Sequence, residues 1–273
     1  MRKVIFITGL FILLAGCVKE TTWTPTAPVK PMLVVDGIIT NEVKKHQIFL
    51  SLPRVLLNQT PPPFTGASVL ISNEDSTWQL SENPVKPGCY QTPGWFSAKP
   101  QKNYTLLIAR NDTVYTAKTT MMAEKIFQEL RYLKNNDNGL YYVDWVANAF
   151  SIGDAAMWEL LIDWSMVPGY EQGDSLKTHA RLLFYTLPTL DVSEVFAPKM
   201  QTTFFPAGAI ITERRYSLTP WHAGFIREML LETNWTGGLF TVAPANVSTN
   251  VSNGAIGFFG ACGVYELSVV VTP

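Results

Sequence analysis

Short runs of β-forming residues, separated by turn residues, recur through the first half of the chain and constrain its fold most strongly. The run at 46–52 alternates, with Ile48, Leu50 and Leu52 on one face. The runs at 104–110 and 113–119 flank Asn111-Asp112, which predicts a hairpin. The other runs lie at 32–35, 38–40, 66–72, 77–80 and 88–91. About seven short strands at this spacing predict an immunoglobulin-like β-sandwich over residues 32–122.

Residues 123–273 predict a second, β-rich domain with one short helix. Its strand-like runs lie at 127–133, 140–147, 158–164, 180–187 and 209–218. The helix is predicted to begin after Thr219, an N-cap residue, because Pro220 suits the first helical position. Apolar residues then recur at helical spacing: Trp221, Phe225, Met229 and Leu230. The glycine-interrupted tail at 254–271 predicts one or two buried strands, so the fold class is mainly β.

The first sixteen residues have the pattern of a lipoprotein signal peptide. Arg2 and Lys3 precede an apolar run that ends at Leu14, too short to cross a bilayer as a helix. The order Leu14-Ala15-Gly16-Cys17 resembles a bacterial lipobox, which predicts cleavage between Gly16 and Cys17 and acylation of Cys17. An ordinary signal peptide with a chance cysteine is the alternative. Residues 17–31, rich in proline and threonine, predict an extended tether.

Composition excludes some function classes. The chain has 273 residues, 16% of them charged, with a formal net charge of −1, so it lacks the basic surface that nucleic-acid binding requires. Removal of the leader with Arg2 and Lys3 makes the net charge more negative. Cys89 and Cys262 remain after lipidation, and two separate buried thiols are favoured over a disulfide. No Cys-x-x-Cys motif is present.

Five stretches together resemble a known family. They are LVVDGIIT at 33–40, GASVLIS at 66–72, GCYQTP at 88–93, NYTLLI at 103–108, and PANVSTNVSNGAIGFFGAC at 244–262. With the lipobox, they resemble the Bacteroidota outer-membrane lipoproteins known as domain of unknown function 4249. The last stretch is the most specific, and the resemblance spans nearly the whole chain. It implies a lipoprotein often encoded beside a TonB-dependent receptor, with no established activity and no agreed catalytic residues.

No motif in the sequence points to catalysis or to a metal. The three histidines, His46, His179 and His222, lack metal-ligand spacing, and a solvated loop is predicted for His46. Asp144 and Asp163 each precede a tryptophan, as in some glycosidase sites, but solvent-facing strand positions are the simpler interpretation.

Other polar and aromatic residues are given structural interpretations. Glu213-Arg214-Arg215 is predicted to be an exposed patch on a strand. Asparagines in the tail are predicted to shape turns: Asn246, Asn250 and Asn253. Trp158 and Trp164 are assigned to the core, whereas Trp23, Trp78 and Trp95 are candidates for exposure.

The sequence therefore predicts a non-enzymatic, lipid-anchored accessory protein of the outer membrane, without cofactor or metal. Its expected partners are the membrane, through the lipid on Cys17, and a TonB-dependent receptor. A surface glycan- or peptide-binding lipoprotein acting alone is the alternative, and an unrecognised hydrolase is the third. The face of the outer membrane and the ligand remain open.

Overall fold

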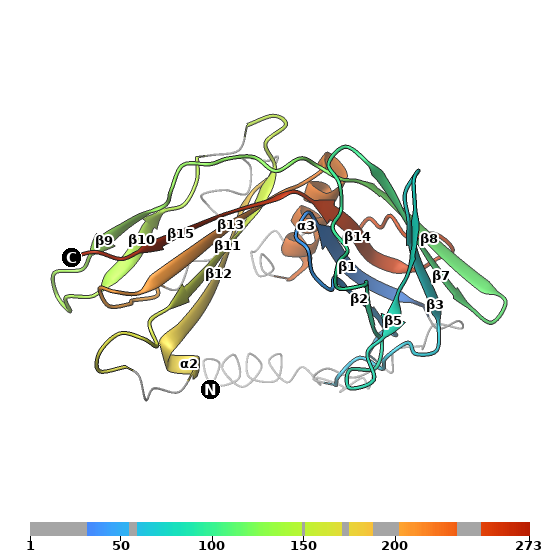
Figure 1. Cartoon of the computed structure of the whole chain (residues 1–273), viewed down its shortest axis with the longest axis horizontal. Helices are drawn as coiled ribbons and strands as arrows, with labels where there is room; N and C mark the ends of the chain where they lie inside the picture. Colours follow the sequence, from blue (N-terminus) through green and yellow to red (C-terminus); the bar gives the residue numbers. More distant parts are fainter. Residues whose placement is uncertain (1–31, 55–58, 149–150, 171–174, 188–201, 234–246) are drawn as a thin grey trace, which may run out of the picture. The chain divides into compact units, whose positions relative to one another are not determined.

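A computed structural model describes residues 32–54, 59–148, 151–170, 175–187, 202–233 and 247–273 (Figure 1). The predicted leader and tether, including Gly16 and Cys17, lie outside the described residues. Within the described ranges the fold is mainly β, as the sequence predicts. None of the helices described there has both the length and the apolar composition needed to cross a membrane.

Two sheets form the N-terminal β-sandwich. One has the strand order β14-β1-β2-β6-β5 and the other β4-β3-β7-β8. The strands are β1 (Val34–Thr40), β2 (Gln47–Ser51), β3 (Ser68–Ser72), β4 (Thr77–Gln79), β5 (Ser81–Glu82), β6 (Cys89–Gln91), β7 (Asn103–Arg110), β8 (Thr113–Thr120) and β14 (Ile256–Cys262). Alternate residues of both sheets, such as Ile48 and Ile71, are fully buried in one shared core. A sandwich is therefore present, and its immunoglobulin-like topology stays a prediction.

Strand β14 comes from the C-terminal end of the chain but completes the first sheet. It pairs in parallel with β1, from Val34 opposite Ile256 to Thr40 opposite Cys262. The domain boundary predicted at residue 122 is therefore crossed by this sheet. Close approach of the two strands requires Gly257, whose φ is +95° and where a Cβ atom would overlap the backbone of Val35.

Asn250 ties β14 to the second sheet of the sandwich. Its side chain donates to the carbonyl oxygens of Lys118 (3.0 Å) and Phe259 (2.7 Å) and accepts from the Phe259 N–H (3.0 Å). Asn253 adopts a positive φ of 60° in the following turn and donates to the Val114 carbonyl. Asn253 thus shapes a turn as predicted, Asn250 connects two sheets, and Asn246 lies outside the described residues.

The C-terminal part contains a four-stranded antiparallel sheet in the order β12-β11-β13-β15 and a two-stranded hairpin. These strands are β9 (Arg131–Lys134), β10 (Tyr141–Trp145), β11 (Ala156–Asp163), β12 (His179–Thr186), β13 (Ile210–Ser217) and β15 (Val264–Val270). The helices are α2 (Ser175–Thr178) and α3 (Pro220–Thr233). Trp158, Leu160 and Ile162 of β11 face a core that the β9–β10 hairpin helps to cover. Trp158 and Trp164 are buried as predicted.

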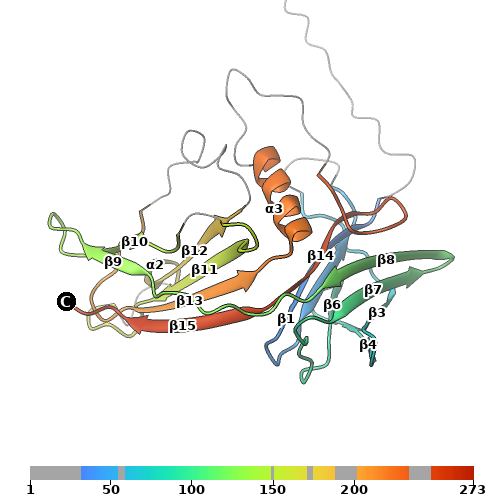
Figure 2. The same ribbon diagram turned by 90° about the horizontal axis from the view of Figure 1, so that it is seen from above.

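Helix α3 packs on the outer face of β14 (Figure 2). The ring of His222 stacks on Phe258 at 4.7 Å and lies against Gly260, where a side chain would clash with it. The buried side of α3 consists of His222, Ala223, Ile226 and Leu230. The stripe predicted from Trp221, Phe225, Met229 and Leu230 is therefore rotated from the observed one, and Trp221 is half-exposed.

Candidate functional site

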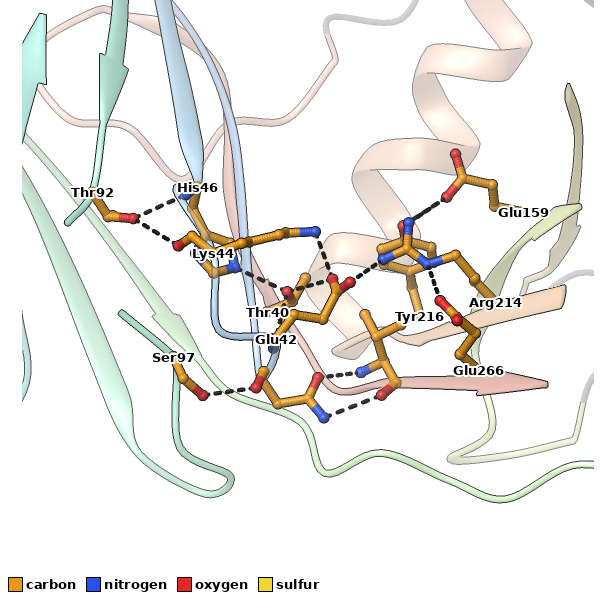
Figure 3. Close-up of polar contacts among 12 residues, drawn as sticks. Thr40, Glu42, Lys44, His46, Thr92, Ser97, Glu159, Arg214, Tyr216 and Glu266 are labelled. Carbon is orange, nitrogen blue, oxygen red and sulfur yellow. Dashed lines mark hydrogen bonds and ion pairs between the residues drawn. The ribbon is translucent and has the colours of Figure 1, made fainter. Parts of the chain in front are cut away.

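A cluster of charged side chains joins the sandwich to the C-terminal sheet (Figure 3). Arg214 of β13 stands at its centre, with its guanidinium group 2.5 Å from Glu42, 3.1 Å from Glu159 and 3.3 Å from Glu266. Glu159 also accepts hydrogen bonds from Arg181 (2.6 Å) and from the Tyr216 hydroxyl (2.7 Å). Glu42 lies in the loop after β1 and Glu159 in β11, so this cluster connects the two parts.

The ionised state of both central acids is stabilised by their neighbours. Burial opposes ionisation of Glu159, but bonds from Tyr216 and Arg181 and the charge of Arg214 hold its pKa below the usual value. Burial likewise opposes ionisation of Glu42, and bonds from Lys44 and Thr40 hold its pKa low. Each acid is paired with a cation, so no charge in the cluster is left unpaired. The cluster links the sandwich to the C-terminal sheet through these ion pairs.

Hydrogen bonds between side chains and backbone reinforce this junction. Asn41 accepts from the Val264 N–H (2.8 Å) and donates to the Val264 carbonyl (3.1 Å), as an added strand would. The Asn41 amide also contacts Glu124, and its own carbonyl accepts from Ser97 (2.7 Å). The junction is therefore held by both side chains and main chain.

The prediction that Glu213-Arg214-Arg215 forms an exposed patch is wrong. Glu213 and Arg215 are 1% and 2% exposed, because they share the core-facing side of β13. Arg215 donates to Asp154 (2.5 Å) and to Ser217 (2.7 Å), and its guanidinium group lies over the Trp158 ring. Both side chains lie on the face of β13 that contacts the Leu130 backbone and the Trp158 ring, so that face is interior.

Glu213 is expected to make folding stability depend on pH. Burial raises its pKa to about 7, although the Leu130 N–H donates to it. The native state therefore holds this proton more tightly than the unfolded chain, whose value is near 4.5, and stability falls as pH rises from about 4.5 to about 7. We expect Glu213→Gln to raise the free energy of unfolding by about 2 kcal/mol at pH 8 and by little at pH 4.

Urea denaturation of wild type and variant across this pH range measures the difference. Wild type must be compared with the variant because two other groups also make stability depend on pH. His46 and His222, each with a pKa lowered to about 4, make stability fall as pH falls, the opposite of Glu213. Both contribute stability that is lost as pH falls from about 6.5 to about 4. A wild-type-to-variant difference that stays constant from pH 4 to pH 8 contradicts the role assigned to Glu213.

The three histidines lie apart from one another in the fold. His46 is 2% exposed rather than solvated, a correction to the prediction, because Phe96 and Thr92 cover it and its Nε2 is 2.9 Å from the Thr40 hydroxyl. Burial lowers the pKa of both His46 and His222. His179 lies 3.2 Å from Asp163. In the described part of the chain, no three His, Cys, Asp or Glu side chains gather as a metal site requires.

The paired acids and the cysteines also have structural surroundings. Asp144 is exposed and meets Arg131 at 3.3 Å, whereas Asp163 accepts from Ser165 and faces His179. Cys89 and Cys262 are both buried and free, as favoured from the sequence. Cys262 Sγ lies 3.6 Å from His222 Nδ1, and complete burial raises its pKa to about 12, so it remains a thiol.

A groove of about 560 Å³ lies between the end of the β7–β8 hairpin and the start of α3. Trp221 forms one wall, is 52% exposed, and meets Phe258 edge-on at 6.2 Å. Lys118, Thr119 and Thr120 of β8 form the other wall. The remaining lining residues are Asn103, Tyr104, Thr105, Met122, Thr219, Pro220 and Phe258. An exposed indole beside hydroxyl, amide and ammonium groups can bind a ligand with both apolar and polar parts.

A second, smaller hollow of about 200 Å³ opens in the C-terminal part. It is lined by aromatic side chains, including Trp145 and Trp158, and by Arg215 and Asp154. Both charges are already engaged with each other, and Asp154 also meets Lys125 at 3.1 Å. The larger groove at Trp221 is therefore the better candidate site.

Comparison with protein-family models identifies the family. Residues 20–164 fit the model described as domain of unknown function (DUF4249), which is more than half of the chain. The chain belongs to the DUF4249 family. A search of curated proteins finds no match.

The DUF4249 match covers the sandwich strands up to β8, the β9–β10 hairpin and β11. It ends before 244–262, the stretch that gave the sequence resemblance its most specific part. Glu42 and Glu159 lie inside the matched region and Arg214 lies outside it. The description of the family names no activity, so function is argued from the groove and from the predicted leader.

Sequence reasoning missed the groove. The helical spacing places Trp221 in the apolar stripe of the predicted helix, and Lys118 falls in a run predicted only as a strand. The helical spacing of Ala223, Ile226 and Leu230 offered an alternative buried stripe that leaves Trp221 outside. Among the tryptophans considered for exposure, Trp95 is 69% exposed, Trp78 packs partly against the core, and Trp23 lies outside the described residues.

Proposed function

We propose that this DUF4249 protein is a lipid-anchored, non-enzymatic binding protein of the bacterial outer membrane that works with a TonB-dependent receptor in nutrient uptake. The observation that carries the binding role is the groove at Trp221, where an aromatic ring that could have been buried is left half-exposed. The sequence Leu14-Ala15-Gly16-Cys17 supports the anchor. Tethering raises the effective concentration of the groove near a membrane partner.

A hydrolase is the less supported candidate. The described lining of the groove contains no acid, histidine or serine that would act as nucleophile or general base. An independent glycan- or peptide-binding lipoprotein uses the same groove, and differs from the first proposal only in having no receptor partner.

Co-purification tests the proposal. After in vivo crosslinking and mild-detergent extraction, the wild-type protein is expected to retain a TonB-dependent receptor, and Cys17→Ser is expected to lose both membrane attachment and receptor. Trp221→Ala should reduce the recovered receptor at least fivefold, because it removes the exposed indole from the groove. Trp95→Ala is the matched control, since it removes a tryptophan that is also exposed and does not line the groove.

Two outcomes contradict the proposal. A protein that migrates alone after crosslinking has no receptor partner and supports independent binding instead. Equal recovery by the Trp221→Ala and Trp95→Ala variants shows that the receptor contacts another surface. Mass spectrometry of the native protein checks the lipid on Cys17 directly.

A further inference from the structure

The described residues of the chain cover only part of one edge of β8. The N–H of Thr116 donates to Ser252 Oγ (2.8 Å), and its carbonyl accepts from the Ser252 N–H (2.8 Å). Next along this edge, the Lys118 carbonyl accepts from the Asn250 side chain (3.0 Å). The backbone groups of Thr116 and Lys118 therefore point away from β7.

The same geometry continues to Thr120. In an antiparallel ladder the direction of backbone groups alternates with a period of two residues, so the N–H and carbonyl of Thr120 also point away from β7. Residues 250–252, which cover the edge at Thr116 and Lys118, do not extend to Thr120. Upstream of them, Ser248 bonds to α3 instead: its N–H and its hydroxyl each donate to the Glu228 carboxylate at 2.7 Å. Within the described ranges, the Ala117–Val251 bridge is the pairing recorded on this side of β8.

The part of this edge that none of the described residues pairs with borders the groove. Thr119 and Thr120 line it together with Trp221, whose exposed ring can receive an apolar side chain. Lys118 is the charged residue among the described lining residues, so an acidic group on the ligand is the complementary one. Backbone groups at strand spacing match another backbone, and a sugar offers no such repeat.

We propose that an extended peptide segment of the partner binds this groove as an added strand on β8. An aromatic or aliphatic side chain of the segment lies against Trp221, and an acidic side chain lies near Lys118. The peptide continues along the edge that residues 250–252 of the protein begin. This inference rests on the proposed function, because it names the chemistry of the partner.

The test selects ligands from a library of capped hexapeptides on the lipidated full-length protein in detergent micelles, with counter-selection on Trp221→Ala. Enriched peptides are expected to contain β-branched or aromatic residues and an acidic residue. In the tightest of them, N-methylation at alternate positions should weaken binding at least tenfold, and at the intervening positions less than twofold. This alternation reports backbone pairing, which a side-chain contact alone does not produce.

Variants of the protein test the binding mode independently of the modified peptides. Thr120→Pro removes the outward N–H and should weaken binding at least fivefold, whereas Thr120→Val loses only the hydroxyl and should retain it. Lys118→Glu should disfavour the acidic peptides at least fivefold. N-methylation acts on the peptide, so its result stands even where a protein variant folds poorly.

Three results overturn the inference. They are a library without enriched peptides, N-methyl effects that do not alternate, and oligosaccharide binding on a glycan array that Trp221→Ala abolishes. If the receptor co-purifies through Trp221 while the library gives no ligand, the proposed function stands and the strand-addition mode falls. If peptides bind with alternation and no receptor is recovered, the binding mode stands and the receptor partnership falls.

Discussion

Replacing Gly257 with alanine is expected to destabilise the protein by about 4 kcal/mol or more, which is exceptional for one methyl group. The backbone at Gly257 has a φ of +95°, which L-residues rarely adopt, and the new Cβ would overlap the Val35 carbonyl. The three nearest atoms are all backbone atoms of Val35, so no flexible side chain can move away to make room. The parallel pairing of β14 with β1 must then open, and thermal and urea denaturation will measure the loss.

Gly254→Ala is the matched control for this prediction. Gly254 also has a positive φ, +73°, but no atom lies within 4 Å of its added Cβ. It should therefore show only the conformational cost of a left-handed residue, about 1 kcal/mol. Equal losses at the two positions would show that backbone conformation, and not the contact between β1 and β14, sets the requirement for glycine.

Arg214→Met is expected to cost about 3 kcal/mol of unfolding free energy. The side chain is 13% exposed and meets three carboxylates, so its removal leaves Glu159, only 8% exposed, with one cation fewer. Arg181 still pairs with Glu159, but it is the more exposed of the two cations, and taking one cation from a buried acid is destabilising even where the intact pair adds little. The measurement is urea denaturation at neutral pH.

Two further variants show whether charge imbalance causes the destabilisation by Arg214→Met. Arg131→Met removes an exposed ion pair with Asp144 and should cost less than about 1 kcal/mol. The double variant Arg214→Met with Glu159→Met should recover part of the unfolding free energy that Arg214→Met loses, because it also removes the acid that lost a cation. A double variant as unstable as the sum of the two single ones would contradict charge imbalance as the cause.

Local patterns in the sequence predict most strands, because a strand shows alternating apolar residues and has turn residues close to its ends. The hairpin around Asn111-Asp112 is observed as β7 and β8, and Asn111 adopts the positive φ of 50° that such a turn uses. The parallel pairing of β1 with β14 could not be found in this way. The paired residues are more than two hundred positions apart, and the sequence of neither strand indicates which other strand it pairs with.

The candidate site shows the same limit more strongly. Glu213, Arg214 and Arg215 have the polarity of an exposed patch, but tertiary contacts cover them: Glu213 and Arg215 lie on a buried face, and Arg214 meets three carboxylates. His46 follows two lysines and reads as a loop residue, yet Phe96 covers it. Trp221 is apolar and reads as core, yet the helix presents Ala223 and Ile226 to the sheet instead.

The pairing of β1 with β14 also sets the order in which this polypeptide can mature. Residues 34–40 leave the ribosome early, and their neighbouring strand is complete only when residue 262 has followed. Contacts so distant in sequence form slowly, so the first sheet stays unfinished during synthesis. A product truncated before residue 256 would keep the edge of β1 open, and open edges recruit other chains. Premature termination should therefore yield insoluble material rather than a stable N-terminal fragment.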